Sequence, residues 1–153
     1  MRFLFEQTIA ASQKAIFAFH ENPQHLVLLH REWAAFRMIA HDGNLRPGSR
    51  TWFEVNFAGI MPVALGFEQK VYLPPHCYSE ELIHGPFCKF THRHEFKAVD
   101  TGTRVRDALE ITLPWYYGGE WAMRLLIAPA IEQAFLQRGE ALQKLAQNDV
   151  QFT

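Results

Sequence analysis

The sequence has few of the features that mark disulfide-rich, zinc-binding or nucleic-acid-binding proteins. It contains two cysteines, Cys77 and Cys88, which are too few for a disulfide framework or a zinc-ligand pattern. With histidines neutral the net charge is −1, so the chain has no basic field with which to bind nucleic acid. Nucleic acid is therefore not an expected partner.

Long apolar runs are also missing. No run approaches the roughly 18 residues that cross a bilayer as a helix. The N-terminal stretch MRFLFEQTIAAS alternates in character and carries Glu6 early, unlike the continuous apolar core of a signal peptide. These absences predict no integral membrane segment and, with so few cysteines, a cytoplasmic location.

Aromatic residues, by contrast, are abundant. Hydrophobic residues make up 48% of the chain and aromatic residues 14%, with 13 phenylalanines. The length of 153 residues predicts a single domain spanning 1–153, which can hide roughly 68–70% of its unfolded surface without a disulfide or a structural metal. This composition indicates a large apolar interior, or an interior with an apolar hole in it.

Hydrophobic periodicity predicts seven strands and two short helices before the C-terminal segment. The first strand is predicted over residues 2–9. Ser12 and Asn22, the latter followed by Pro23, are good helix N-caps and predict short helices over 13–20 and 23–30. The other strands are predicted over 36–40, 49–57, 63–73, 77–84, 88–99 and 103–113.

The C-terminal segment 120–148 has the spacing of one long amphipathic helix. Its apolar positions are Trp121, Leu125, Ala128, Ile131, Phe135, Leu142 and Leu145. Pro129 inside the segment predicts a kink. Only this helix is long enough to cover the apolar face of the sheet. The expected fold class is therefore α+β, with a seven-stranded curved antiparallel sheet wrapped around the C-terminal helix and two short helices after the first strand.

The stretch HGPFCKFTHRHEF, residues 84–96, gathers three histidines and a cysteine. Side chains alternate along a strand. One face of this strand carries Cys88, Phe90, His92, His94 and Phe96, and the other carries Lys89, Thr91, Arg93, Glu95 and Lys97. The charged face belongs in water, so His92 and His94 are predicted to point into the interior. His84 is expected in water at the hairpin end.

The next strand determines the partner of His94. Its inward face carries Val105, Asp107, Leu109, Ile111 and Leu113. Both apolar faces must lie on the same side of the sheet, and a short turn at 100–102 then sets His94 opposite Asp107 and His92 opposite Leu109. Opposed Cβ atoms lie about 4.5–5.5 Å apart. His94 and Asp107 are therefore predicted to be within hydrogen-bonding reach inside a cavity.

The preceding hairpin leaves two alternatives for the other neighbour of His92. A three-residue loop at 85–87 sets Glu80 opposite His92, on the strand face that also carries Tyr78. A two-residue turn would bring the opposite face of that strand inward and remove the pairing. A Glu80–His92 contact is predicted on the first alternative only.

The inward polar cluster has several interpretations. Buried polar groups need partners, and Asp107 would simply satisfy the histidines of the interior. Alternatively, a few polar groups in an apolar pocket would orient a ligand's hydroxyl, carbonyl or carboxylate. An Asp107–His94 pair would also suit a general base, because the carboxylate fixes the imidazole tautomer.

A metal site is a further alternative for the same stretch. His-x-His on one strand face, with a carboxylate, matches a known ligand set for transition metals. The sequence does not establish the third ligand, and the surrounding cavity is predicted to be apolar. We therefore expect no metal and no cofactor.

Other aromatic residues also have competing interpretations. Trp33 is expected in the core or as a plug at the mouth of the cavity. Trp115, Tyr116 and Tyr117 precede paired glycines and form either a packed corner, which we favour, or a mobile gate.

Strand alternation places several further residues. It puts Arg50, Arg104 and Arg106 on the solvated outer face of the sheet. Cys77 and Cys88 fall on opposite faces, which predicts no disulfide between them. An exposed edge strand would allow a homodimer.

A family resemblance is carried by six stretches: AIFAFHENPQHL, LHREW, DGNLRPGSR, HGPFCKFTHRHEF, DTGTRVRDALEITLP and LLIAPAIEQAF. Their order resembles the START-like, birch-pollen-allergen-like helix-grip superfamily, often called SRPBCC, and within it the polyketide cyclase/dehydrase-type bacterial proteins. The likeness covers nearly the whole chain. It is most specific at Gly-Pro-Phe followed by His-x-His-x-Phe, and it departs at Phe90, where relatives often carry Trp.

The resemblance implies the helix-grip fold and a range of functions. Members bind lipids, sterols, polyketides or plant hormones, some are aromatases or cyclases, and some regulate partners. No single catalytic motif runs through them, so no catalytic role carries over to this chain.

The expected function is binding of a small hydrophobic or amphipathic molecule, such as a lipid, polyketide or aromatic compound, between sheet and C-terminal helix, with no covalent step. The expected ligand-binding residues are Phe53, Val55, Phe67, Tyr78, Glu80, Phe90, His92, His94, Asp107, Leu109, Leu125, Ala128 and Phe135. The first alternative is a cyclase/dehydratase-type enzyme on a polyketide-like substrate, with His94 and Asp107 as its catalytic pair. The second is an interaction protein whose cavity is closed.

Overall fold

The computed structural model describes residues 1–30, 36–57 and 61–147. The chain runs through β1 (Arg2–Ile9), α1 (Gln13–Glu21), α2 (Pro23–Leu29), β2 (Phe36–His41), β3 (Arg50–Phe57), β4 (Met61–Leu73), β5 (Cys77–His84), β6 (Lys89–Val99) and β7 (Gly102–Thr112). A 3₁₀ turn (Trp115–Tyr117) then leads to α3 (Gly119–Ala122), a π turn (Met123–Ile127) and α4 (Ala128–Gln147). Every predicted strand and helix is present, with ends shifted by two residues at most.

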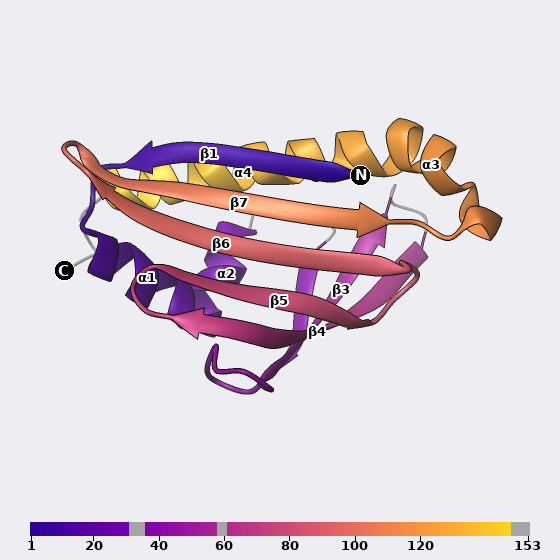
Figure 1. The fold of residues 1–153 in the computed structure, drawn as a ribbon, viewed down its shortest axis with the longest axis horizontal. Coiled ribbons are helices and arrows are strands. Elements are labelled where there is room, and N and C mark those ends of the chain that lie inside the picture. The colour runs from indigo at the N-terminus through magenta and orange to yellow at the C-terminus, as the bar shows by residue number, and fades with distance from the viewer. Residues whose placement is uncertain (31–35, 58–60, 148–153) are drawn as a thin grey trace.

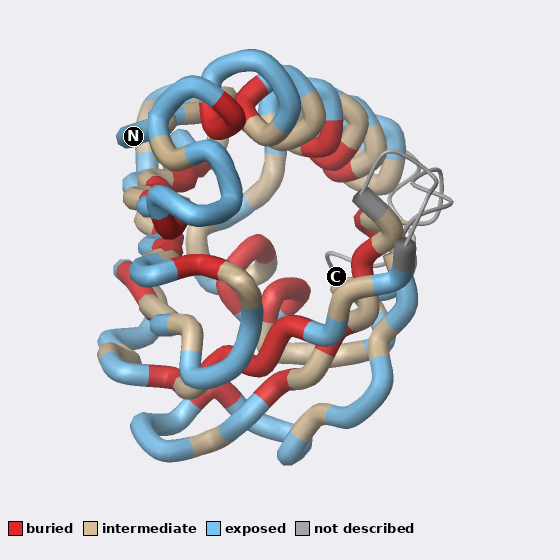
Figure 2. The backbone as a smooth tube through the Cα atoms, turned by 90° about the vertical axis from the view of Figure 1, so that its right-hand side faces the viewer, coloured by how far each residue is buried: buried red, intermediate tan, exposed pale blue. Residues whose placement is uncertain are grey.

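The strands form an antiparallel sheet in the order β1-β7-β6-β5-β4-β3-β2. In Figure 1, α4 runs behind β1 and β7, and the two short helices lie below one end of β6. Seen along the long axis, the curved sheet and the C-terminal helix close a ring (Figure 2). This arrangement confirms the predicted α+β helix-grip fold.

The two short helices begin where their capping residues predict. The Ser12 hydroxyl accepts a hydrogen bond from the backbone N–H of Ala15 at 3.3 Å. The Asn22 side chain accepts one from the backbone N–H of Gln24 at 2.9 Å, and Pro23 occupies the first helical position. Each cap satisfies a donor that the first helical turn leaves free.

Among the described residues, two hydrophobic clusters form the core. The first contains Ile9, Ile16, Phe17, Phe19, Leu29, Leu45, Tyr78, Phe96, Val105 and Leu142. The second contains Phe53, Val55, Leu65, Phe67, Phe87, Leu109, Ile111 and Met123. Phe5 of β1 stacks on Phe135 of α4, with ring centroids 4.4 Å apart, and this contact packs the helix against the sheet edge.

The C-terminal helix departs from the predicted apolar stripe at its first turns. The N–H of Ala128 donates to the carbonyl of Met123 across the π turn, which holds one more residue than an α turn. Pro129 follows and has no N–H to donate. The inward face is therefore carried by Met123, whereas Trp121 and Leu125 are 69% and 56% exposed. The expectation that these two residues face the interior is wrong.

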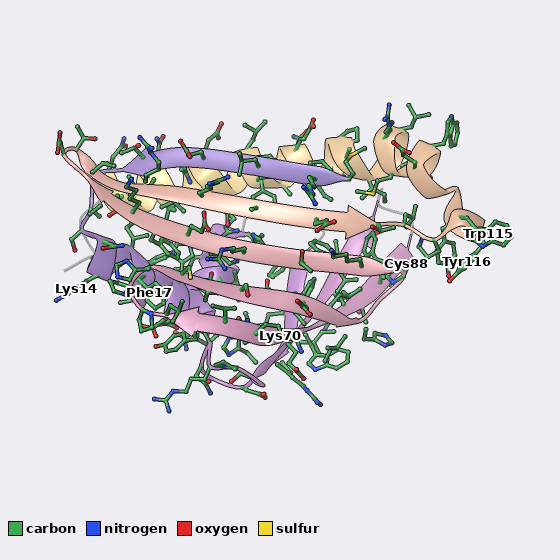
Figure 3. The ribbon with its side chains drawn as sticks, viewed as in Figure 1. Lys14, Phe17, Lys70, Cys88, Trp115 and Tyr116 are labelled. Atoms are coloured by element: carbon green, nitrogen blue, oxygen red, sulfur yellow. The ribbon has the colours of Figure 1, made fainter. Side chains whose placement is uncertain are left out.

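The aromatic segment before α3 does not form a packed corner. Trp115, Tyr116 and Tyr117 are 86%, 64% and 55% exposed. They follow β7 on a 3₁₀ turn, and Trp115 and Tyr116 project from one end of the molecule (Figure 3). The favoured interpretation is wrong because this turn extends past the end of the sheet. Trp33 lies outside the described residues.

The outer face of the sheet is charged, as strand alternation predicts. Arg50, Arg104 and Arg106 are exposed. Cys77 is buried, Cys88 is exposed, and both are free thiols, which confirms the prediction of no disulfide. Across the described ranges, none of the helices combines the length and the apolar character needed to cross a membrane.

Gly102, at the start of β7, has a backbone conformation that disfavours a side chain. Its φ is 136°, and a Cβ would lie 2.1 Å from the carbonyl oxygen of Ile9. We expect Gly102→Ala to lower the free energy of unfolding by at least about 2 kcal/mol, because strain at positive φ adds to a clash with main chain. Urea unfolding measures this loss.

Gly43→Ala is the matched control for Gly102→Ala. Gly43 has a φ of 81°, but nothing described lies within 4 Å of an added Cβ. The free energy of unfolding of Gly43→Ala should therefore fall only by the cost of backbone strain, about 1 kcal/mol. Equal losses in the two variants would contradict the steric explanation.

Candidate functional site

β6 and β7 pair in the predicted register. His94 lies opposite Asp107, and His92 lies opposite Leu109. His94 Nδ1 and Asp107 Oδ1 are 2.6 Å apart, which is a short, charge-assisted hydrogen bond. Both side chains are buried. The prediction that His94 and Asp107 meet inside the fold is confirmed.

His92 lies between two carboxylates. Glu80 of β5 is its partner across the sheet, as the three-residue loop predicts. The His92 Nδ1 atom is 3.5 Å from Glu80 Oε1, and its Nε2 atom is 3.1 Å from Asp107 Oδ1. Each ring nitrogen therefore faces a different carboxylate.

Two further side chains complete this group. Arg138 of α4 places Nη1 3.3 Å from Asp107 Oδ1 and is only 4% exposed. Gln69 of β4 donates through Nε2 to Glu80 Oε2 at 3.0 Å. We call Gln69, Glu80, His92, His94, Asp107 and Arg138 the Asp107 cluster. It links four successive strands, β4, β5, β6 and β7, to the C-terminal helix through polar contacts.

The two histidines of the Asp107 cluster have opposite pKa shifts. Burial lowers the pKa of His92, but its hydrogen bonds to Asp107 and Glu80 outweigh burial, so that the pKa is raised. Burial and the positive charge of His92 hold the pKa of His94 well below its usual value. A proton on this pair therefore resides on His92, and His94 is neutral.

Asp107 is ionised despite its burial. Burial raises the pKa of this carboxyl, but Arg138, His94 and His92 together hold it well below its usual value. Because the Nδ1–H of His94 donates to Asp107, the lone pair of His94 is on Nε2. The 3.4 Å contact between Arg138 Nη2 and His94 Nδ1 then joins two donor atoms, so it is not a hydrogen bond.

A cavity of about 130 Å³ lies between the concave face of the sheet, α2 and α4. Its walls are mostly apolar and include members of both hydrophobic clusters. The polar part of the wall includes Gln69, Glu80, His92, His94 and Arg138 of the Asp107 cluster. Ten of the expected ligand-binding residues line it: Phe53, Val55, Phe67, Tyr78, Glu80, Phe90, His92, His94, Leu109 and Phe135.

Three expected ligand-binding residues do not line this cavity. Leu125 is exposed because the π turn rotates it away from the interior. Ala128 is buried, but the part of the cavity wall on the C-terminal helix begins at Ala130. Asp107 contacts the cavity residues His92 and His94 instead of reaching the cavity itself.

Sequence reasoning missed several polar residues of the wall, of which His20, Gln69 and Arg138 are central. All three are buried and line the cavity. Each occupies an apolar position of its element: His20 lies four residues after Ile16, and Gln69 lies two after Phe67. Arg138 lies on the inward face of α4 in the same way. A polar residue at an apolar position of a predicted element is the signal that identifies them.

Two buried acceptor atoms in this wall have no hydrogen-bond partner among the described residues, namely His20 Nε2 and Gln69 Oε1. His20 Nδ1 donates to the carbonyl of Ile16 at 2.8 Å, which leaves a lone pair on Nε2. Gln69 uses its amide nitrogen on Glu80 and keeps its carbonyl oxygen free. Unpaired buried acceptors are costly, so a bound molecule that donates a hydrogen bond to either atom would gain affinity.

Glu80, His92 and His94 also bring together the atoms that bind metals. One such atom from each lies within 4.8 Å of the others. The sequence left the third ligand open, and the structure supplies Glu80 from β5.

His20 makes the stability of the fold depend on pH. Burial and the charge of Arg138 lower its pKa to about 4. The unfolded chain, with a histidine pKa of about 6.5, therefore binds this proton first, and stability falls as the pH drops from about 6.5 toward 4. We expect His20→Gln to reduce the loss of unfolding free energy between pH 7 and pH 5 by about 2 kcal/mol.

Urea unfolding at both pH values measures this effect. The exposed His84 provides the control, since His84→Gln should leave the difference between the two pH values unchanged. The assignment to His20 fails if wild type and His20→Gln lose the same stability over this range.

The buried pair of Asp107 and Arg138 should behave as a coupled unit. Asp107→Asn or Arg138→Met alone leaves a buried charge without its counter-charge, with an expected loss of about 3 kcal/mol or more. The double variant should lose less than the sum of the two by at least about 1 kcal/mol. A double-mutant cycle by urea unfolding measures the coupling.

The exposed pair of Lys89 and Glu110, 2.8 Å apart, is the control for this cycle. Solvent screens it, so Lys89→Met and Glu110→Gln should be nearly additive. Additive losses at Asp107 and Arg138 as well would show that their charges do not depend on each other.

No family model matches the chain, and no curated protein matches it. Solved structures do match its fold. Protein Ms6760 from Mycobacterium smegmatis is 17% identical with a TM-score of 0.73, over 97% of this chain and 92% of the other. Protein CV1439 from Chromobacterium violaceum is 14% identical with a TM-score of 0.71, over 95% and 96%. Ara h 8.0201 is 13% identical with a TM-score of 0.64, over 97% and 98%. At these identities the likeness shows a shared helix-grip fold and not a shared function.

Proposed function

We propose that this protein binds a small hydrophobic or amphipathic molecule in the cavity between sheet and C-terminal helix, without a covalent step. The observation that carries the proposal is the cavity itself, a space of about 130 Å³ with mostly apolar walls and a few convergent polar groups. Such a combination is typical of small-molecule sites. The walls would supply affinity through apolar burial, about 25 cal/mol per Å².

The size of the cavity favours a compact ligand. One water needs roughly 10–15 Å³ of such space and takes up about 30 Å³ of liquid, so the cavity of about 130 Å³ corresponds to on the order of ten waters. A volume of about 130 Å³ is below the 300–1,000 Å³ range of ligand pockets. Of the ligand classes expected from the sequence, a one- or two-ring aromatic compound fits this space better than a long lipid chain, and the space is also small for a sterol.

The polar wall favours a ligand that donates hydrogen bonds. His20 Nε2 and Gln69 Oε1 are acceptors without partners among the described residues, and neutral His94 also carries a lone pair. A hydroxyl group would satisfy one of these acceptors, because a buried acceptor gains most from a donor that replaces lost water. We infer that the ligand presents a phenol or alcohol to this wall.

A general base mechanism has less support. The His94–Asp107 pair has the hydrogen bond that a general base needs. However, burial and the neighbouring His92 hold the pKa of His94 well below its usual value, and an efficient base has a pKa near the working pH. His92 has a raised pKa, but both its nitrogens face carboxylates. Binding without chemistry therefore remains the proposal.

Native mass spectrometry of the purified protein, before and after denaturation, tests whether it carries a ligand. A mass that is released on denaturation and belongs to a small organic molecule would support the proposal and identify the chemical class. If no mass is released, added 2-naphthol, a compact fluorescent phenol, tests the empty cavity. Failure to bind it with one-to-one stoichiometry would overturn the proposal.

Filling the cavity should abolish this binding. Ala134 lines the cavity and is buried, so Ala134→Phe should weaken 2-naphthol binding at least tenfold by occupying its space. Leu136, on the same helix, is 67% exposed, and Leu136→Phe should leave binding unchanged. Fluorescence titration measures both, with circular dichroism to confirm folding. Equal affinity in the two variants would place the ligand elsewhere.

A further inference from the structure

The geometry points to a binding site for a divalent first-row transition-metal ion, with Glu80, His92 and His94 as its ligands. We propose this site because the three side chains each place a metal-binding atom within 4.8 Å of the others. Two imidazoles and one carboxylate on one side of an ion are a ligand set used for Zn²⁺ and Fe²⁺. The site does not depend on whether the cavity also takes an organic ligand.

Asp107 orients both histidines as a metal site requires. Its Oδ1 atom lies 3.1 Å from His92 Nε2 and 2.6 Å from His94 Nδ1. Histidines that bind metals almost always donate their second N–H to a carboxylate or carbonyl in this way. When both rings are neutral, their N–H groups are therefore directed to Asp107, which leaves the lone pairs on His92 Nδ1 and His94 Nε2.

Glu80 is oriented in the same manner. Its Oε2 atom accepts a hydrogen bond from Gln69 Nε2 at 3.0 Å. The other oxygen, Oε1, faces His92 Nδ1 at 3.5 Å, so the two ligand atoms approach each other. All three ligands thus have a hydrogen-bonded second group behind them, which is the supporting arrangement seen around bound metals.

The distances are close to those of an occupied site. With bonds of about 2.0–2.1 Å, ligand atoms around a tetrahedral ion lie about 3.4 Å apart. Separations of up to 4.8 Å must therefore shorten by about 1.4 Å at most. Glu80 is the ligand with most freedom, since its side chain is 12% exposed while those of His92 and His94 are 9% and 4% exposed.

The buried charges favour a cation at this position. Glu80 and Asp107 carry two negative charges, and Arg138 carries one positive charge, so the Asp107 cluster is one negative charge in excess once a metal ion has displaced the proton of His92. Arg138 contacts Asp107 at 3.3 Å, so its positive charge lies against that carboxylate. Burial strengthens the attraction of the excess charge for a dication.

The unpaired acceptors provide independent support. His20 Nε2 and Gln69 Oε1 are buried in the same cavity wall with no partner among the described residues. The centroids of the His20 and His94 rings are 6.2 Å apart, so the acceptor of His20 lies near the proposed ligands. A water bound to the ion would donate its protons to such acceptors, and metal sites with three protein ligands commonly keep a water in the remaining position.

Cobalt(II) titration of the purified protein, stripped with a chelator and then dialysed, tests the site. We expect one Co²⁺ per chain, with visible absorption from a low-symmetry site, and loss of this absorption when Zn²⁺ is added. Glu80→Gln should weaken Co²⁺ binding at least tenfold, because it removes a charged ligand and leaves the shape of the side chain. His94→Gln should have a similar effect.

His84→Gln is the matched control, because His84 lies on the same strand as Glu80 but is exposed. It should bind Co²⁺ as wild type does. Thermal unfolding of the stripped proteins shows which variants are folded, and Glu80→Gln, the least buried of the three positions, is the decisive one if His94→Gln unfolds. Absent binding by wild type, or unchanged binding by a folded Glu80→Gln, would overturn the proposal. Binding of 2-naphthol by the stripped protein is measured separately and stands or falls on its own.

Discussion

The buried carboxylate of Asp107 is the constraint on which this structure depends. An isolated charge inside an apolar sheet face is prohibitively costly, so the fold must bring partners to it. It does so with His92 and His94 from β6 and with Arg138 from α4. The same contacts that satisfy one carboxylate therefore fix where the C-terminal helix sits along the sheet.

Apart from Asp107 itself, the Asp107 cluster also lies in the wall of the cavity. Members of both hydrophobic clusters line the cavity together with the Asp107 cluster. Apolar side chains that closed over His20 Nε2 and Gln69 Oε1 would exclude any donor from these two acceptors, which is costly. A space therefore remains in which an organic molecule or a metal ion can meet unpaired acceptors.

Much of the sheet side of this site was predictable from sequence. Strand alternation put His92 and His94 inside, and the requirement that both apolar faces lie on one side of the sheet fixed His94 opposite Asp107. The pairing of Glu80 with His92 depended on the length of the loop between β5 and β6, which the sequence left open. The helix side was predicted less well, because one π turn before Pro129 shifts the apolar face, exposing Leu125 in place of Met123. The exposed Trp115 shows the same limit, since aromatic character alone does not reveal whether a neighbour is there to cover it.

The sequence by itself determined the order of elements, the capped short helices and the faces of the strands, because these follow from local periods and from hydrogen bonds between near neighbours in the chain. Only the tertiary structure decided which polar residues meet. Arg138 reaches Asp107 across 31 positions of sequence, and Gln69 reaches Glu80 across a strand pair whose register shifts at a bulge. Periodicity assigns each of these residues to a face, but it does not determine the position of a helix along a sheet. The cavity, its volume and its unpaired acceptors are set by that packing.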